Sequence, residues 1–306
     1  MVLEYFFIIF ATVLFSVQFL FTKKYQLCVG SGNAASFFHK GVAPISFAII
    51  LTIYSFITIP GFKLEVTWFT LLLSLFSLGV SLTLSVISLK VLAKGSIANY
   101  GLYLLSGGMI VPVVFGFFIG DNFGWWKILS ILCILGAILV KFNFKEKLDL
   151  KSYLFLVGLF VLNGLSGVIS TIHSQDVFGL GLSVTPQSFS IVNLLLGSVV
   201  GFILFAITAI KNRKEMQIKP FLKAIPWSVA EGICNGLGNF LLLIALLKVD
   251  ASMQYPIVTG GCIFLSAILP FIIYKEKMSV KGWISVALAV VGSIIIIFPE
   301  SWLIFF

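Results

Sequence analysis

Long apolar runs separated by short polar stretches dominate the pattern of this chain. We count ten such runs of about 18 to 26 residues: 3–22, 36–59, 67–91, 97–119, 126–143, 152–173, 186–210, 222–247, 252–274 and 280–298. As an α-helix, which rises about 1.5 Å per residue, each run is long enough to cross a hydrocarbon core of about 30 Å. The runs lack the alternation of membrane barrel strands. The pattern therefore predicts an all-α integral membrane protein with ten transmembrane helices.

The composition agrees with this prediction. Hydrophobic residues make up 60% of the chain and charged residues 10%, whereas about a quarter of the residues of a soluble domain are charged. The first run has no basic leader and no small-residue cleavage site after it, so we expect a spanning helix rather than a signal peptide. The four cysteines show neither a disulfide framework nor a metal-ligand spacing. We expect no metal and no cofactor.

Lysine and arginine are distributed unequally between the two sides that ten spans would create. Lys63, Lys127 and Lys248 fall on the side of the even-numbered connections, and the other lysines and arginines fall on the side of the odd-numbered ones. By the positive-inside rule, the odd-numbered connections are cytoplasmic and both termini lie outside. The net charge of +9 is then explained by topology and not by nucleic acid binding. We expect a multi-pass protein of the plasma membrane, in a bacterial cell.

The second half of the chain repeats the first. Leu89-Lys90-Val91 precedes the string CILGAILVKF, and Leu247-Lys248-Val249 precedes AVVGSIIIIF, with matching glycine, aliphatic and final phenylalanine positions. The repeat divides the chain into residues 1–145 and 150–300, with five spans in each half. Because five is odd, the second half must start on the opposite side of the membrane. Such inverted repeats are typical of secondary transporters, which hold their substrate where the repeats meet.

The strings of the last three spans also resemble a known family. They read GNFLLLIALLKVDAS, then a proline-containing span that ends FIIYKEKMS, then KGWISVALAVVGSIIII. In these features the chain is similar to the EamA-type transporters of the drug/metabolite transporter superfamily, in which a glutamate recurs after the ninth span, here Glu276. In the first half, Gly120-Asp121 stands where that glutamate would be expected. The resemblance implies two inverted five-helix halves, a central cavity and alternating access. Members carry amino acids, nucleotide sugars or choline-like amines, so the substrate stays open.

Glu231 is the sharpest candidate for function, because it lies near the middle of the eighth span. A carboxylate at that depth costs several kcal/mol and by default marks a functional site. Asn235 and Asn239 follow at steps of four residues, so the three polar groups share one helical face. We expect this face to line a substrate cavity, with Glu231 also a candidate for proton coupling because burial disfavours its charged form. The alternative is a buried cluster that only joins helices.

The duplication offers a check on this face. Superposing the two Leu-Lys-Val triplets maps Asn235 onto Ser77 and Asn239 onto Ser81, within a row of serines on the third span. Glu231 maps onto Leu73. We therefore expect an asymmetric site, with Ser77 and Ser81 as supporting contacts. Serine is also common at contacts between membrane helices, which is the other interpretation of the row.

Further candidates are aromatic or amide side chains within the spans. Tyr100, Tyr103 and Tyr255 are predicted to line the cavity, where their rings suit a cation, or else to anchor the helices at the membrane interface. Gln18 and Asn163 lie in the first span of each half and are predicted polar contacts.

Three basic side chains near span ends admit simpler roles. His39 and Lys40 begin the second span, and we favour a Lys40 side chain that snorkels to the interface over one that meets an anion. His173 ends the sixth span, where we expect it to be solvated.

These observations predict a secondary active transporter that moves a small polar metabolite, an organic cation or an amino-acid-like solute, by alternating access. The chain has no phosphate-binding glycine-rich loop and no nucleophile with a base, so we expect no enzyme. The alternative function is a flippase for a lipid-linked head group, or a membrane scaffold subunit. The expected partners are the small-molecule substrate and the lipid bilayer, with no nucleic acid, in a monomer or a homodimer.

Overall fold

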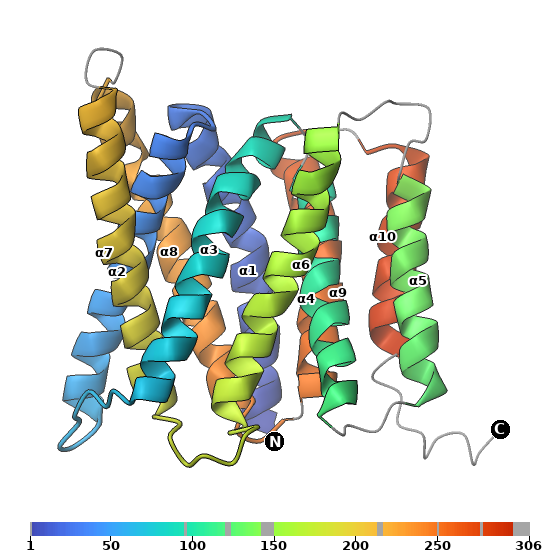
Figure 1. The fold of residues 1–306 in the computed structure, drawn as a ribbon. Coiled ribbons are helices and arrows are strands. Elements are labelled where there is room, and N and C mark those ends of the chain that lie inside the picture. Colours follow the sequence, from blue (N-terminus) through green and yellow to red (C-terminus); the bar gives the residue numbers. More distant parts are fainter. Residues whose placement is uncertain are drawn as a thin grey trace.

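Ten α-helices form a single bundle in the computed structural model, which describes residues 2–94, 97–119, 124–141, 150–212, 217–249, 251–275 and 278–295 (Figure 1). These are α1 (Val2–Val29), α2 (Asn33–Thr58), α3 (Trp68–Lys94), α4 (Ile97–Phe118), α5 (Trp125–Lys141), α6 (Leu150–Ser174), α7 (Pro186–Lys211), α8 (Lys219–Ala245), α9 (Ala251–Ile273) and α10 (Val280–Ile295). The described residues contain no strand. The predicted all-α architecture with ten helices is confirmed. Glu276 and the Gly120-Asp121 pair lie outside the described residues.

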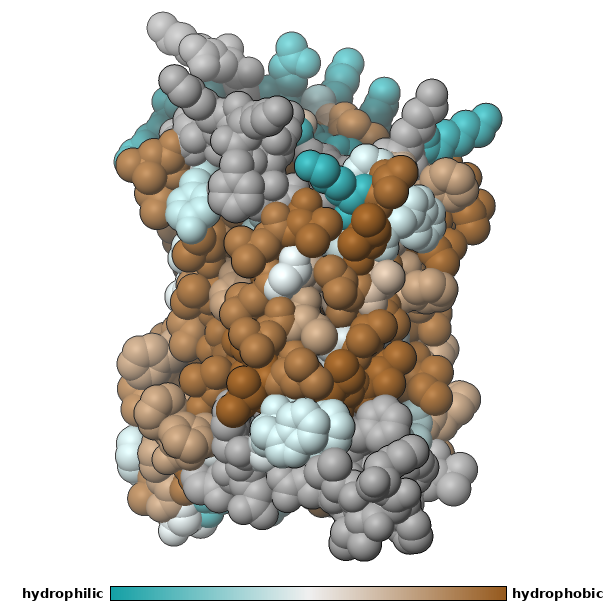
Figure 2. All heavy atoms as spheres, turned by 90° about the vertical axis from the view of Figure 1, so that its right-hand side faces the viewer, coloured by the Kyte–Doolittle hydropathy of each residue, from teal (hydrophilic) through white to brown (hydrophobic). Residues whose placement is uncertain are grey.

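The surface and the helix lengths are those of a membrane protein. By length and composition, α1, α2, α3, α4, α6, α7 and α8 can each cross a membrane, whereas α5, α9 and α10 present shorter apolar segments. Figure 2 shows an apolar band across one face of the bundle, with hydrophilic side chains gathered at its upper edge. The chain is thus a helical membrane protein.

Successive helices run in opposite directions through the bundle. α1, α3, α5, α7 and α9 all finish at the upper end in Figure 1. Lys94, Lys211, Lys219 and Lys281 lie in the terminal turns of helices at this end. We call it the cation-rich end and the other the opposite end. The predicted partition of charge between two sides is reproduced by the fold.

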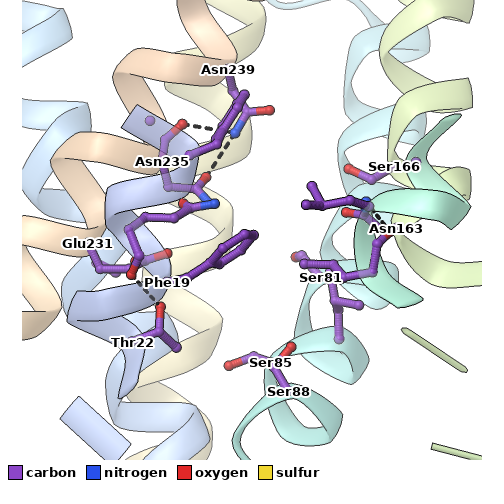
Figure 3. A pocket seen from close by; sticks show the side chains of 18 of the residues that line it. Phe19, Thr22, Ser81, Ser85, Ser88, Asn163, Ser166, Glu231, Asn235 and Asn239 are labelled. Carbon is purple, nitrogen blue, oxygen red and sulfur yellow. Dashed lines mark hydrogen bonds between the residues drawn. The ribbon is translucent and has the colours of Figure 1, made fainter. Parts of the chain in front are cut away.

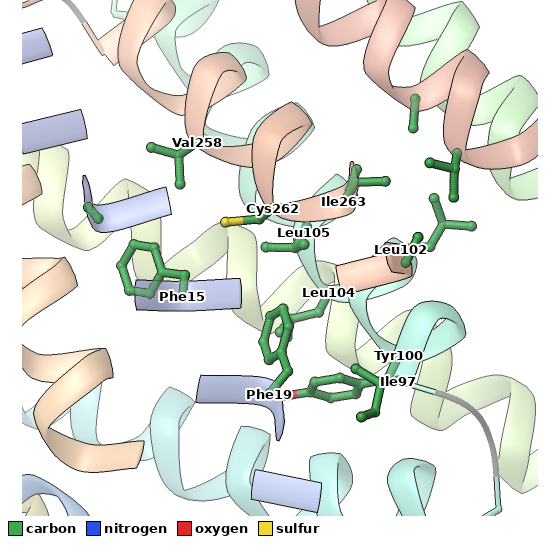
Figure 4. Close-up of a cluster of buried hydrophobic side chains, with 14 of the residues drawn as sticks. Phe15, Phe19, Ile97, Tyr100, Leu102, Leu104, Leu105, Val258, Cys262 and Ile263 are labelled. Atoms are coloured by element: carbon green, nitrogen blue, oxygen red, sulfur yellow. The ribbon is translucent and has the colours of Figure 1, made fainter. Parts of the chain in front are cut away.

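The helices pack in a pattern that joins the two halves of the chain. α1 packs against α8 and α9, α2 against α7 and α8, α3 against α6 and α7, α4 against α6 and α9, and α5 against α10. The largest buried apolar cluster lies where α1, α4 and α9 meet, and it includes Phe15, Leu105 and Cys262 (Figure 4). Helices that are distant in sequence therefore hold the bundle together.

Small residues permit close contact between these helices. A Cβ atom on Gly232 of α8 would overlap the carbonyl group of Ala43 on α2, so the two backbones touch there. The Ser198 hydroxyl of α7 donates a 2.6 Å hydrogen bond to the Gly41 carbonyl of α2, which lies three residues before Pro44. Such contacts are typical of helices that associate in lipid, where burial of apolar surface does not drive association.

Candidate functional site

A cavity of about 300 Å³ lies inside the bundle, between α1, α2, α3, α4, α6, α8 and α9, with one residue from α7. Ligand sites of this size are at the small end of the range of about 300–1,000 Å³ for small molecules. Polar side chains line it at several heights: Gln18, Thr22, His39, Lys40, Ser81, Ser85, Ser88, Tyr100, Asn163, Ser166, Ser170, Glu231, Asn235, Asn239, Tyr255 and Thr259. A polar cavity within an apolar bundle is the arrangement that a water-soluble ligand requires.

One wall of the cavity is the polar face of α8. Glu231, Asn235 and Asn239 line the cavity at successive turns, as their spacing predicted (Figure 3). Asn239 donates hydrogen bonds of 2.9 Å and 2.8 Å to the carbonyl and side-chain oxygens of Asn235. Glu231 is only 9% exposed, and Asn235 hydrogen-bonds to its side chain. The three residues therefore form one connected polar row.

His39 of α2 completes this wall, although no role in the site was expected for it from its position in the sequence. Its Nε2 atom lies 3.4 Å from Oε2 of Glu231, and its Nδ1 atom lies 2.8 Å from the Ser228 hydroxyl oxygen. The Tyr25 ring packs on the imidazole, with 4.5 Å between ring centroids. Both ring nitrogens are thus engaged, and His39 fixes the position of the buried carboxylate. This role could not be predicted from the place of His39 near the start of α2, because only the packing of α2 against α8 brings His39 and Glu231 together.

The facing wall consists of hydroxyl and amide groups from α3 and α6. Ser81, Ser85 and Ser88 of α3 face the cavity together with Asn163 and Ser166 of α6, across from the α8 row in Figure 3. The Ser81 hydroxyl donates to the Leu78 carbonyl, and the Ser85 hydroxyl donates to the Ser36 carbonyl. With their hydrogens used in this way, these hydroxyl oxygens can still accept hydrogen bonds from a ligand.

Two of the three predicted tyrosines line the cavity. The Tyr100 hydroxyl donates to the Ser88 hydroxyl at 3.1 Å, and the Tyr100 ring meets the Phe19 ring edge-on. The Tyr255 hydroxyl donates to the Gly167 carbonyl at 3.1 Å. Their hydroxyl groups tie helices of the wall together, while parts of both side chains contribute to the cavity surface.

Gln18 and Asn163 also lie where the sequence predicted polar contacts. Asn163 of α6 donates a 2.8 Å hydrogen bond to the Leu104 carbonyl of α4. Gln18 of α1 is 7% exposed, and its Oε1 atom has no hydrogen-bond partner among the described residues. A buried amide oxygen without a partner costs free energy, and a ligand with a hydrogen-bond donor would satisfy it.

Ser77 and Tyr103 do not line the cavity, so these two assignments are corrected. Ser77 lies one turn nearer the opposite end than Ser81, and the cavity does not reach α3 at that depth. Tyr103 follows Tyr100 by three residues, which turns it onto a different face of α4, toward Tyr153 of α6. The alignment of the two Leu-Lys-Val triplets predicted cavity contacts on α3 and α8, and residues of both helices line the cavity, but at different depths.

The predictions for Lys40 and His173 are also wrong. Lys40 lines the cavity and does not extend to the membrane interface. His173 is 2% exposed; its ring stacks on Phe189 at 3.8 Å, and its Nε2 atom accepts a hydrogen bond from the Val184 amide. The sequence places both residues near helix ends, but packing against α7 buries His173 and covers part of Lys40.

Comparisons with known proteins bear on the fold alone. No family model matches the chain, and no curated protein matches its sequence. Fourteen chains of solved structures match its fold. One of them, described as "Crystal structure of protein", superposes with a TM-score of 0.62 at 14% sequence identity, over 93% of this chain and 97% of that one. The similarity therefore extends over the whole fold and does not identify a function.

Proposed function

We propose that the chain is a secondary active transporter that carries a small polar metabolite, an organic cation or an amino-acid-like solute, across the plasma membrane. The observation that carries the proposal is the polar cavity inside a membrane bundle, with the buried Glu231 carboxylate in its wall. A buried charge is expensive to keep in a membrane protein and is retained where it serves a substrate or a proton. Glu231, Asn235 and Asn239 are the principal binding residues in this proposal, with Ser81, Tyr100, Tyr255, Gln18 and Asn163 as supporting contacts.

Transport by alternating access needs two halves that can rock against each other, and the packing of the helices supports such halves. Exchanging each helix for the one five places along the chain converts the α1–α8 pair into α6–α3, α1–α9 into α6–α4, and α2–α8 into α7–α3. The same exchange leaves the α2–α7, α4–α9 and α5–α10 pairs unchanged. Residues 1–145 and 150–300 are the proposed inverted repeats, and the EamA-type transporters are the proposed family.

The two ends of the bundle support the same symmetry. Near the cation-rich end, an apolar cluster joins α1, α2, α3 and α8 through residues such as Tyr25, Phe38 and Phe221. Near the opposite end, another cluster joins α3, α7 and α8 through Phe69, Phe189 and Leu243. Apolar clusters that close both ends of a central cavity suit a carrier, in which the helices separate at one end while the other end stays closed.

The cation-rich end is the cytoplasmic one in this proposal. Maleimide labelling of a Glu65→Cys variant from outside intact cells tests that orientation.

Substitution of Glu231 tests the function. A panel of amino acids and organic amines is first screened by the shift in melting temperature of the purified protein, and each hit is then measured as uptake into proteoliposomes. We expect the Glu231→Gln variant to keep its melting temperature without ligand and to lose uptake. The control is Glu65→Gln, because Glu65 is an exposed carboxylate between α2 and α3. Unchanged uptake by Glu231→Gln contradicts the proposal, and a lower melting temperature with normal uptake assigns Glu231 to packing instead.

A further inference from the structure

The Lys40 side chain points away from the nearer end of the membrane. α2 begins at the cation-rich end, and side chains on a helix usually lean toward its N-terminus, which is the direction of snorkelling here. The Lys40 backbone touches α7 at the level of Gly201. Its side chain instead passes Gly197, one helical turn or about 6 Å farther from the cation-rich end. A Cβ on Gly197 would lie 3.3 Å from Lys40 Cε and 3.7 Å from Nζ. The ammonium group is thus directed toward the middle of the bundle.

Local features of both helices allow this direction. Pro44 lacks the N–H group that would bond to the Lys40 carbonyl, which loosens α2 at that turn. Gly197 has no side chain, and this leaves room beside α7 for the end of the Lys40 side chain. The inward direction of the ammonium group therefore follows from how α2 and α7 are built.

The Lys40 ammonium group is available to a ligand. It forms no hydrogen bond and no ion pair of 4 Å or less with any of the residues that the structure describes, and the side chain is only partly buried. Among the described residues of the cavity wall, Glu231 is the one carboxylate. It interacts with Lys40 electrostatically, while its direct partners are His39 and Asn235. The cavity thus presents a positive and a negative group that are not paired with each other.

This charge pattern selects among the solutes that the proposed function allows. An organic cation without a negative group would be attracted to Glu231 and repelled by Lys40. An organic anion would be attracted to Lys40 and repelled by Glu231. A ligand that carries both charges satisfies both groups, and its N–H donors also suit the free oxygen of Gln18 and the serine oxygens of α3. Resting on the proposed function, we infer that the cavity binds a zwitterion with a primary or secondary ammonium group, whose carboxylate contacts Lys40 and whose ammonium contacts Glu231.

Ligand triplets test the inference on the full-length protein. Each of the twenty standard amino acids is compared with the amine that lacks its carboxylate and with the acid that lacks its ammonium group, by calorimetric affinity. We expect at least one amino acid to bind about tenfold or more tightly than both of its counterparts, since each lost charged contact costs at least that factor.

Substitutions at and near Lys40, compared with a control substitution, are the second test of the inference. Lys40→Met should weaken binding of that amino acid by about tenfold or more and leave binding of its amine unchanged or improved. Because Met replaces an unpaired cation, the variant should melt no lower than the parent protein. Gly197→Ala, which crowds the lysine stem, should weaken binding of the amino acid in the same direction. Lys223→Gln, an exposed lysine at the start of α8, should change neither affinity.

Some results of these experiments contradict the inference alone, and others also contradict the proposed function. The inference is overturned if an amine binds and is transported as well as its amino acid and Lys40→Met changes neither affinity. The protein would then be a transporter of organic cations. A carboxylate that binds without any ammonium group also overturns it. If no member of the panel binds or is transported, the proposed function itself fails and the inference fails with it.

Discussion

The alignment of the two Leu-Lys-Val triplets pairs Glu231 of α8 with Leu73 of α3, yet the bundle places these two residues in opposite environments. Glu231 lines the cavity beside His39, Asn235 and, at longer range, Lys40. Leu73 is buried in the apolar cluster with Phe69 and Phe189 near the opposite end. A carboxylate on α8 where the aligned position of α3 carries leucine makes the cavity wall electrically asymmetric, and in the proposed transporter this wall would orient a ligand that has two different ends.

The backbone contact at Gly232 leads to a prediction for stability. In Gly232→Ala the added Cβ overlaps the Ala43 carbonyl, so α8 and α2 must move apart. We expect the free energy of unfolding to fall by about 1–3 kcal/mol, the usual cost of overpacking, as a lower melting temperature in detergent. Gly79→Ala on α3 is the control, because no atom lies within 4 Å of its added Cβ. Equal melting temperatures for the two variants would refute the close contact between α2 and α8.

The residues of the site were predictable to different degrees. The row of Glu231, Asn235 and Asn239 follows from helical spacing alone, since residues four apart share a face. His39 and Lys40 could not be assigned, because their roles depend on how α2 packs against α7 and α8. The one sequence signal for Lys40 is indirect: Pro44 follows four residues later and frees its carbonyl.

Among the elements, the helix boundaries were largely predictable because hydropathy decides where a membrane helix can lie. Most described ends fall within three residues of the predicted ones. α1 is the exception: it continues to Val29 through Lys23 and Lys24, which interrupt the apolar run but not the helix. Lys23 donates to the Leu92 carbonyl at the end of α3, and Lys24 lies over the Tyr274 ring. Tertiary contacts thus stabilise a polar turn that hydropathy assigns to a connection.

The pairing of α5 with α10 can be tested with a single substitution. A Cβ on Gly292 would lie 3.1 Å from the Cβ of Cys133, close to the spacing of about 3.5–4.5 Å found in disulfides. We expect mild oxidation of Gly292→Cys to join α5 to α10 through Cys133, detected by peptide mass spectrometry. The same substitution with Cys133→Ser should give no such link. A link to Cys262 or Cys234 in its place would show that α10 packs elsewhere.

For the whole bundle, we propose two five-helix halves that enclose one polar cavity. The contacts between helices keep their pattern when the halves are exchanged, while the chemistry of the cavity wall does not. In the proposed carrier, this framework would give two related ways to close the bundle, and the uneven wall would give the ligand one orientation. The sequence indicated the repeat, but the cavity could not be located without the packing, because α3 and α8 meet it at different depths.

A counterflow experiment shows whether this bundle is a carrier. Proteoliposomes loaded with an unlabelled amino acid that binds the cavity are diluted into a trace of the same solute in radiolabelled form. We predict a transient accumulation of label above its equilibrium level in loaded vesicles, absent from unloaded vesicles and from vesicles with Glu231→Gln. Equal label in loaded and unloaded vesicles would contradict the account, because a channel, a flippase or a scaffold does not exchange one solute molecule for another.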